Sequence, residues 1–295
     1  MIKKGIYIYE NALKQEHEKQ LPTELIISDK TATEAILIRL LCGTLDVYNN
    51  KNKKFKQRSN YSSLEPSKKT KLHNKTISNF FLFDNELGIE EKLNINKYIK
   101  SNRKNHFIHE EVLSELTSAI LLIKDSPIES FVHIYRTLEF ISYPFPLIYA
   151  SKSMDYKGSY ESLKKFMTGD SVGELKFLRH FLIELFKNNM IFNYEFDILF
   201  TSSNITYIKE EFEKIFSNIV TFENTTMKIK FANIADLLIT LRNRYFHMLI
   251  GSGVNNFCDI RYDKREIFYT LNPLFINWLT IIYQEIVNYS VALII

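Results

Sequence analysis

Apolar residues recur every three or four positions through most of the chain after residue 105, which is the spacing of one buried helix face. The clearest start signal is Ser126-Pro127-Ile128-Glu129, a cap followed by Pro at the first helical position and Glu at the third. We expect helices at 110–123, 126–142, 160–167, 171–188, 207–219 and 233–250, and another from Asn272-Pro273 onward. The pattern predicts a helical bundle over residues 105–295.

The first hundred residues follow a less regular pattern. Apolar stretches at 5–9 and 24–27 are candidate short strands. Thr31-Ala32-Thr33-Glu34 has the form of a capping box and predicts a helix through about Tyr48. We therefore divide the chain into an N-terminal accessory region at 1–100, which contains a lysine-rich loop at 49–75, and a helical domain at 105–295.

Composition agrees with a helical fold. The chain is 45% hydrophobic and 14% aromatic, enough for a real core, and its eight Gly and six Pro are few for a turn-rich β protein. The net charge of +4 excludes a general polycation, so any nucleic-acid surface must be a local patch. The fold class that we predict is all-α.

Other classes of protein lack support in the sequence. Cys42 and Cys258 form no Cys-x-x-Cys pair, and no Gly-rich phosphate loop or Gly-x-Ser-x-Gly motif is present, so we expect no metal and no cofactor. Met1 to Gly5 leads to no long apolar signal segment. Polar residues interrupt the apolar stretch at 274–295, which favours a buried helix in a cytoplasmic protein, with membrane anchoring as the weaker alternative.

The helix expected at 233–250 carries the candidate chemistry. Its buried face has Leu238, Leu241 and Tyr245 at helical spacing. At 100° per residue, Arg242, Asn243 and His247 lie on the opposite side, around Phe246. A guanidinium, an amide and an imidazole on one surface can bind a phosphate and transfer a proton.

The pattern Arg-Asn-x-x-x-His on an apolar helix resembles the signature of HEPN-domain proteins, in which four to six residues separate Arg from His. The resemblance covers the chain from about residue 107 onward. It implies an all-α HEPN-like bundle that forms a homodimer and brings two motifs together. Many members are metal-independent ribonucleases of toxin–antitoxin, abortive-infection and other antiphage systems.

The resemblance implies an endoribonuclease that cleaves tRNA or another cellular or phage RNA by attack of the 2′-OH, leaving 2′,3′-cyclic phosphate ends. His247 is then the general acid or base, and Arg242 binds the phosphate and stabilises its charge. Asn243 either orients His247 or donates to a non-bridging oxygen. HEPN toxins that are controlled by adenylylation often carry His-x-Tyr, but Leu249 occupies that position here. We therefore do not expect that mode of control.

Two further groups of residues are candidates for supporting roles. Tyr135, Arg136 and Glu139 lie on one predicted helix. Either Arg136 and Glu139 simply form a salt bridge, or this helix packs near the motif, so that Glu139 orients Arg242 or His247 or Arg136 contacts RNA. The lysine-rich loop is either a solvated segment or an RNA contact. Its candidate RNA-binding residues are Lys53, Lys54, Lys56, Arg58, Lys68 and Lys69.

The alternative function is a non-catalytic HEPN-like bundle that acts as a sensor, adaptor or antitoxin. The motif surface would then contact a second copy or a partner protein, such as a cognate antitoxin or sensor. RNA cleavage and a stable protein partner distinguish the two hypotheses.

Overall fold

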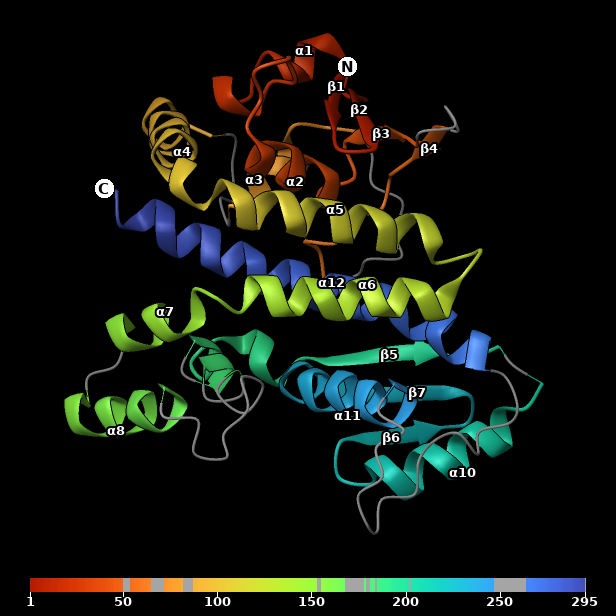
Figure 1. Cartoon of the computed structure of the whole chain (residues 1–295). Helices are drawn as coiled ribbons and strands as arrows, with labels where there is room; N and C mark the ends of the chain where they lie inside the picture. The colour runs from red at the N-terminus through yellow and green to blue at the C-terminus, as the bar shows by residue number, and fades with distance from the viewer. Residues whose placement is uncertain are drawn as a thin grey trace. The chain divides into compact units, whose positions relative to one another are not determined.

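The structure is a computed structural model of the chain. It describes residues 1–49, 54–64, 72–81, 87–152, 155–167, 178, 181–183, 185–201, 203–246 and 264–294, except the side chains of residues 103, 165–167 and 246. The fold is mostly helical, as predicted, but it also contains two small antiparallel sheets, so the expectation of an all-α chain was wrong (Figure 1).

The chain divides into two compact units. One contains Met1–Leu122 together with Ile276–Ile295, and the other contains Ile123–Phe275. This division does not coincide with the boundary that we placed between residues 100 and 105. Helix α5 (His106–Leu122) belongs to the first unit, and α12 (Lys264–Ala292) begins in the second unit and ends in the first. The sequence pattern of the first hundred residues does not show that the end of α12, far along the chain, belongs to the same core.

The sheet of the first unit has the order β1-β2-β3-β4, with every neighbouring pair antiparallel. Its strands are Ile2–Lys4, Tyr7–Asn11, Leu45–Tyr48 and Lys54–Lys56. Tyr9 and Val47 are paired and buried, as one face of a sheet that covers a core requires. Strand β2 overlaps the candidate strand at 5–9. The other candidate, at 24–27, overlaps a 3₁₀ turn, η1 (Thr23–Leu25), and was wrong.

Helix α2 (Thr33–Leu41) ends earlier than the sequence predicted. Gly43 has φ +71°, and a Cβ at that position would lie 2.8 Å from the carbonyl oxygen of Ser59. Only glycine fits this left-handed turn beside a neighbouring backbone without strain. The turn redirects the chain into β3, so the predicted continuation of the helix to Tyr48 was wrong.

Four more helical segments precede α5 in the first unit: α1 (Gln15–Glu18), α3 (Lys75–Phe80), α4 (Ile89–Ser101) and η2 (Asn102–Asn105). Helix α2 packs on α5, and the hydroxyl of Tyr9 lies 2.8 Å from that of Thr117 on α5. The second half of α12 also packs in this unit, where Asn277 Nδ2 donates hydrogen bonds to the carbonyl oxygens of Tyr61 and Ser63 at 2.6 and 2.7 Å.

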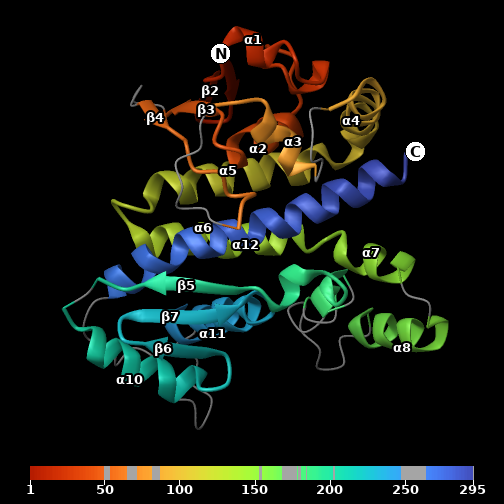
Figure 2. The ribbon, with the colours of Figure 1, turned by 180° about the vertical axis from the view of Figure 1, so that it is seen from behind.

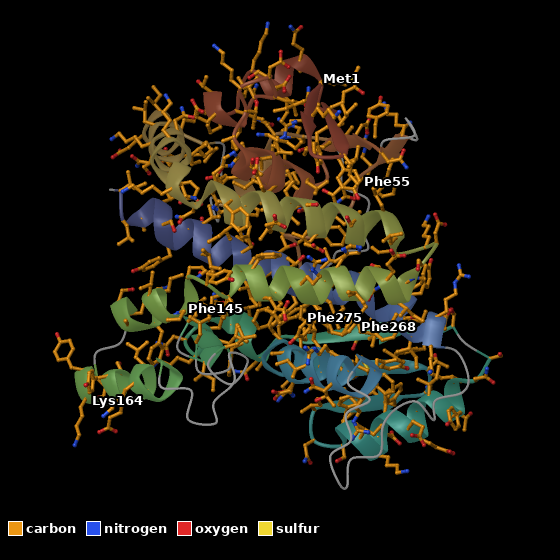
Figure 3. All side chains as sticks on the ribbon, viewed as in Figure 1. Met1, Phe55, Phe145, Lys164, Phe268 and Phe275 are labelled. Atoms are coloured by element: carbon orange, nitrogen blue, oxygen red, sulfur yellow. The ribbon has the colours of Figure 1, made fainter. Side chains whose placement is uncertain are left out.

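The second unit begins with α6 (Pro127–Ile141), which confirms the start signal at Ser126. It continues through α7 (Phe145–Lys152), α8 (Tyr156–Met167), η3 (Met190–Asn193), α10 (Ile205–Phe216), η4 (Phe231–Asn233) and α11 (Ile234–Phe246). The ring of Phe131 on α6 contacts Phe268 and Phe275 on α12, with centroids 4.6 and 5.7 Å apart. These rings form the centre of its core. Phe268 and Phe275 are labelled in Figure 3.

A three-stranded sheet in this unit was not predicted. Strands β5 (Glu195–Leu199), β6 (Val220–Glu223) and β7 (Thr226–Lys230) pair in the order β5-β7-β6, and α10 packs against β6 (Figure 2). Asn224 has φ 54° in the two-residue turn between β6 and β7. Asn tolerates this conformation, which matches the twist of a hairpin.

Two other helix predictions hold only in part or fail. The segment expected at 171–188 is helical at 178, 181–183 and 185–186, residues 187–188 form a turn, and the remaining positions lie outside the described residues. The start expected at Asn272-Pro273 was wrong, because Pro273 lies inside α12. The amide of Asn272 is buried and donates to the carbonyl oxygen of Pro127 at 2.8 Å. In the part of the chain that the structure describes, no helix has the length and apolar run needed to cross a membrane.

Candidate functional site

Helix α11 holds the Arg-Asn part of the predicted motif. Ile234, Leu238 and Leu241 are fully buried, which confirms the predicted core face of this helix. Asn243 is exposed and Arg242 is half-buried, so both lie away from that face. His247 lies outside the described residues, as does the side chain of Phe246. The pairing of Arg242 with His247 therefore stays a prediction.

The guanidinium of Arg242 lies between an amide and an aromatic ring. Its Nη1 donates to Asn243 Oδ1 at 3.0 Å, and its central carbon lies 4.8 Å from the centre of the Tyr135 ring. A guanidinium stacked on a ring is held in one plane, while its edge keeps N–H groups for a ligand. Tyr135 and Asn243 thus orient the cation that the motif assigns to the phosphate.

The structure brings one of the predicted supporting residues to the motif. Tyr135 is 7% exposed and lies on α6, where its ring meets Arg242. Arg136 and Glu139 are exposed on the same helix. The contact of Tyr135 with Arg242 puts α6 beside the motif helix, which is one of the two alternatives that the sequence left open. The ring of Tyr135, rather than the carboxylate of Glu139, is the group seen against Arg242.

Two cations near this end of α11, Arg244 and Lys264, were not singled out in the sequence. Arg244 is half-buried, and burial lowers the pKa of its guanidinium, while the Glu211 carboxylate acts in the opposite direction. Tyr245 contacts Phe268 edge-to-face at 4.7 Å, and Lys264 Nζ lies 5.7 Å from the centre of the Tyr245 ring. Arg244 therefore lies toward α10 and Lys264 lies beside Tyr245, and neither of these contacts involves Arg242.

The lysine-rich loop is described in part. Lys54 Nζ lies 2.7 Å from Asp46 Oδ2, and Arg58 also pairs with Asp46 and donates to the carbonyl oxygen of Leu45 at 2.9 Å. Burial raises the pKa of the Asp46 carboxyl, but the hydrogen bonds from Lys54 and Arg58 outweigh it and leave the pKa below its usual value.

These contacts give Lys54 and Arg58 a structural role at the edge of the first sheet. Lys56 is exposed, and Lys53, Lys68 and Lys69 lie outside the described residues. RNA binding by this loop stays a prediction. Lys54 and Arg58 give it little support, because both already pair with Asp46.

The first unit contains a buried polar cluster around His109. Asn102 Nδ2 donates to His109 Nε2 at 2.8 Å, and the Tyr283 hydroxyl lies 3.1 Å from Nδ1. A carboxylate oxygen of Glu34 lies 3.8 Å from Nε2. Burial lowers the pKa of His109 to about 4, with a smaller contribution from His106, and burial raises the pKa of Glu34.

Burial therefore favours the neutral forms of both His109 and Glu34. A neutral His109 with its proton on Nδ1 can donate to the Tyr283 hydroxyl and accept from Asn102 at Nε2. Among the described residues, no three His, Cys, Asp or Glu side chains converge as a metal site. The cluster is a hydrogen-bonded network that joins η2, α5 and α12.

Comparison with known protein families, with curated proteins and with solved structures finds no match to this chain. The assignment of a function therefore depends on the residues around Arg242 and on the chemistry that they can perform.

Proposed function

We propose that the chain is a HEPN-type endoribonuclease of a prokaryotic toxin or antiphage system, in which Arg242, Asn243 and His247 form the active centre. One observation carries the proposal: Arg242 is held on the outer side of α11 by the ring of Tyr135 and the amide of Asn243. A merely solvated arginine has no such support on both sides. A HEPN-like homodimer, with two motifs facing one another, is part of the same proposal.

The reaction needs one proton acceptor, one proton donor and a stabilised phosphate. A base removes the proton from a ribose 2′-OH, and the oxygen attacks the adjacent phosphorus. The bond from phosphorus to the 5′-oxygen breaks, and an acid protonates that oxygen. The products are a 2′,3′-cyclic phosphate and a 5′-OH, so no water or redox partner is consumed.

The proposed roles follow from the chemistry of each side chain. An imidazole can take up or release a proton near neutral pH, so His247 serves as the base or the acid, and a second copy in the dimer supplies the complementary group. Arg242 donates to the non-bridging oxygens, where negative charge grows in the transition state. Asn243 already accepts from Arg242 and fixes its direction.

The experiment is cleavage of tRNA and total RNA by the purified protein in EDTA. Arg242→Ala should lower the rate by about 10²–10³-fold, the usual effect of removing a donor to transition-state charge. Lys209→Ala is the matched control, because it removes a half-exposed cation from α10 of the same unit. New 5′-OH ends, labelled by polynucleotide kinase, identify the chemistry. Equal rates for Arg242→Ala and the wild type would reject the assignment.

A second candidate is the non-catalytic bundle that binds a partner, and one feature favours it. Large apolar side chains are exposed on and beside α7 and α8: Tyr143 at 63%, Leu147 at 74%, Tyr156 at 86% and Tyr160 at 66%. Exposed apolar groups on neighbouring helices are typical of protein interfaces. This candidate predicts no cleavage at any protein concentration, together with a stable complex in light scattering.

A further inference from the structure

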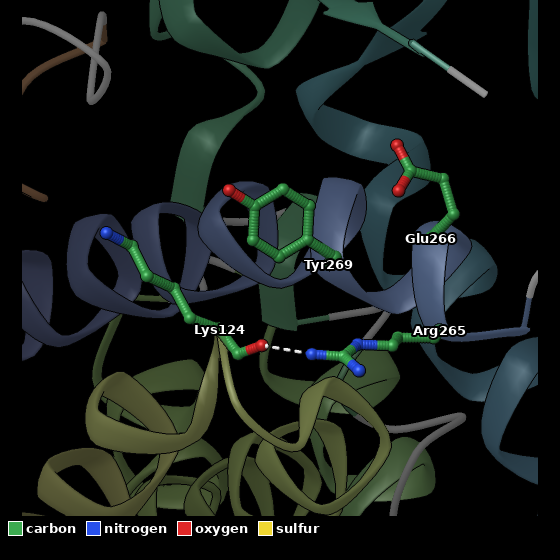
Figure 4. A pocket seen from close by; sticks show the side chains of 4 residues that line it. All are labelled: Lys124, Arg265, Glu266 and Tyr269. Atoms are coloured by element: carbon green, nitrogen blue, oxygen red, sulfur yellow. Dashed lines mark hydrogen bonds between the residues drawn. The ribbon is translucent and has the colours of Figure 1, made fainter.

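A shallow hollow of about 300 Å³ lies in the second unit, lined by Lys124, Arg265, Glu266 and Tyr269 (Figure 4). Lys124 precedes α6, and the other three residues lie on the first turns of α12. Lys124 and Arg265 are exposed, and Tyr269 is 43% exposed. The hollow therefore presents two cations and the face of an aromatic ring to solvent.

Hydrogen bonds fix the charged groups at the rim. Arg265 Nη2 donates to the carbonyl oxygen of Lys124 at 2.9 Å, which is drawn as a dashed line in Figure 4. This contact uses one edge of the guanidinium. The Glu266 carboxylate accepts from the Thr201 hydroxyl at 3.1 Å. With two cations and one anion, the hollow keeps a net positive charge.

Packing contacts connect the hollow with the motif helix. Arg242 contacts Tyr135, while Tyr245, one turn later on α11, contacts Phe268, which also contacts Phe131. Arg242 on α11 thus contacts the middle of α6, and the later Tyr245 contacts Phe268, which packs on Phe131 near the start of α6. Lys124 stands just before that start, and Arg265 and Tyr269 follow Lys264 and Phe268 directly on α12.

We propose that this hollow is a subsite for single-stranded RNA, in which Arg265 and Lys124 bind a backbone phosphate and the ring of Tyr269 stacks on a base. The proposal rests on the proposed function, because it gives the same active centre a second contact with its substrate. A guanidinium held by a carbonyl presents its other edge to phosphate oxygens. Aromatic rings beside cations are typical of single-strand sites, since the bases of a duplex are already stacked.

The test measures binding of a short single-stranded RNA by fluorescence anisotropy. The RNA carries 2′-O-methyl groups, which remove the attacking 2′-OH, so that the wild-type protein binds without cleaving. Tyr269→Ala should weaken binding by about tenfold, and Tyr269→Phe should bind like the wild type. Arg265→Ala should reduce the slope of log Kd against log salt by about one, because one phosphate contact is lost.

Two controls separate the subsite from a change in folding. Arg265→Lys keeps the charge and should retain the salt slope, whereas Glu266→Gln removes the opposing charge and should tighten binding several-fold. A duplex of the same sequence should bind the wild type and Tyr269→Ala equally. Unchanged affinity in Arg265→Ala and Tyr269→Ala, or equal losses for single strand and duplex, would overturn the subsite.

The two proposals fail in different ways. If the binding results are as expected but no RNA is cut, the subsite stands and the nuclease function fails. If Arg242→Ala abolishes cleavage while Arg265→Ala and Tyr269→Ala keep the wild-type KM, the nuclease function stands and the subsite fails.

Discussion

The buried His109 makes the stability of the fold depend on pH in a calculable way. Its pKa is about 4 in the folded chain, because burial and the nearby His106 disfavour the charged ring. In the unfolded chain, a histidine has a pKa of about 6.5. Between these values the unfolded chain binds a proton that the folded chain does not. Stability is therefore complete above about pH 6.5 and falls as the pH drops toward 4.

The magnitude follows from the difference between the two pKa values. The full effect is about 2.5 pH units multiplied by about 1.36 kcal/mol, or about 3 kcal/mol below pH 4. Between pH 7 and pH 5 the loss is about 2 kcal/mol. A protonated ring would place a second N–H against the amide of Asn102, which donates to Nε2 at 2.8 Å. The nearby Glu34 carboxyl gives little compensation, because burial raises its own pKa.

The assay compares urea unfolding of the wild type and His109→Gln at pH 7 and pH 5. Glutamine keeps donors and acceptors for Asn102 and Tyr283 but does not titrate. The stability difference between wild type and variant should shrink by about 2 kcal/mol at pH 5. His106→Gln is the comparison variant: its side chain is 46% exposed on the same helix, and because its contribution to the pKa of His109 is the smaller one, most of the pH-dependent loss should remain. A ring titration of His109 near pH 6.5 by NMR, or no change in the stability difference, would refute the reasoning.

Three further predictions follow from contacts around single residues. Tyr135→Leu should lower RNA cleavage about two- to fivefold, which corresponds to the loss of one cation–π contact, here with Arg242 at 4.8 Å. Steady-state kinetics should show that Tyr135→Phe retains the rate. Gly43→Ala should lower the free energy of unfolding in urea by at least about 2 kcal/mol, because φ is +71° and a backbone oxygen lies 2.8 Å from the new Cβ. Gly5→Ala, with φ +57° and open space around the new Cβ, should lower it by about 1 kcal/mol. Equal losses in the two variants would contradict the close contact at Gly43. Arg39→Met should destabilise the first unit by about 3–5 kcal/mol, because it leaves the acceptors of a fully buried guanidinium unpaired; a smaller loss in thermal unfolding would count against that network.

The sequence predicted those elements whose signals are local and strong. Ser126-Pro127 marks the start of α6, and the apolar spacing on α11 assigns its buried face, which the burial of Leu238 and Leu241 confirms. The signals failed where one residue decides between two structures. Gly43 ends α2 through a contact with a segment far along the chain, and Pro273 lies within a helix that began before it.

The second sheet was missed because its strands are short. Strands β6 and β7 have four and five residues, too few for a period of two to stand out. The alternation of Met227 and Ile229 with lysines, after the turn at Asn224, is the signal that would have found the hairpin.

The sequence predicted which residues belong to the candidate site but not which of them are in contact. The sequence identified both Arg242 and Tyr135, but the stacking of one on the other depends on how α6 and α11 pack. Nothing in the local pattern joins Lys124 with Arg265, which meet across 141 positions of the chain. The sequence gives the charge and type of each side chain, whereas the fold determines which side chains are in contact.

The central claim is that Arg242 works together with His247 on RNA. The most direct measurement is the rate of tRNA cleavage in EDTA by His247→Ala, with the circular dichroism spectrum and melting temperature of the variant compared with those of the wild type. The account predicts that cleavage is lost while the spectrum and melting temperature are retained. Cleavage at the wild-type rate by a folded His247→Ala protein would contradict it.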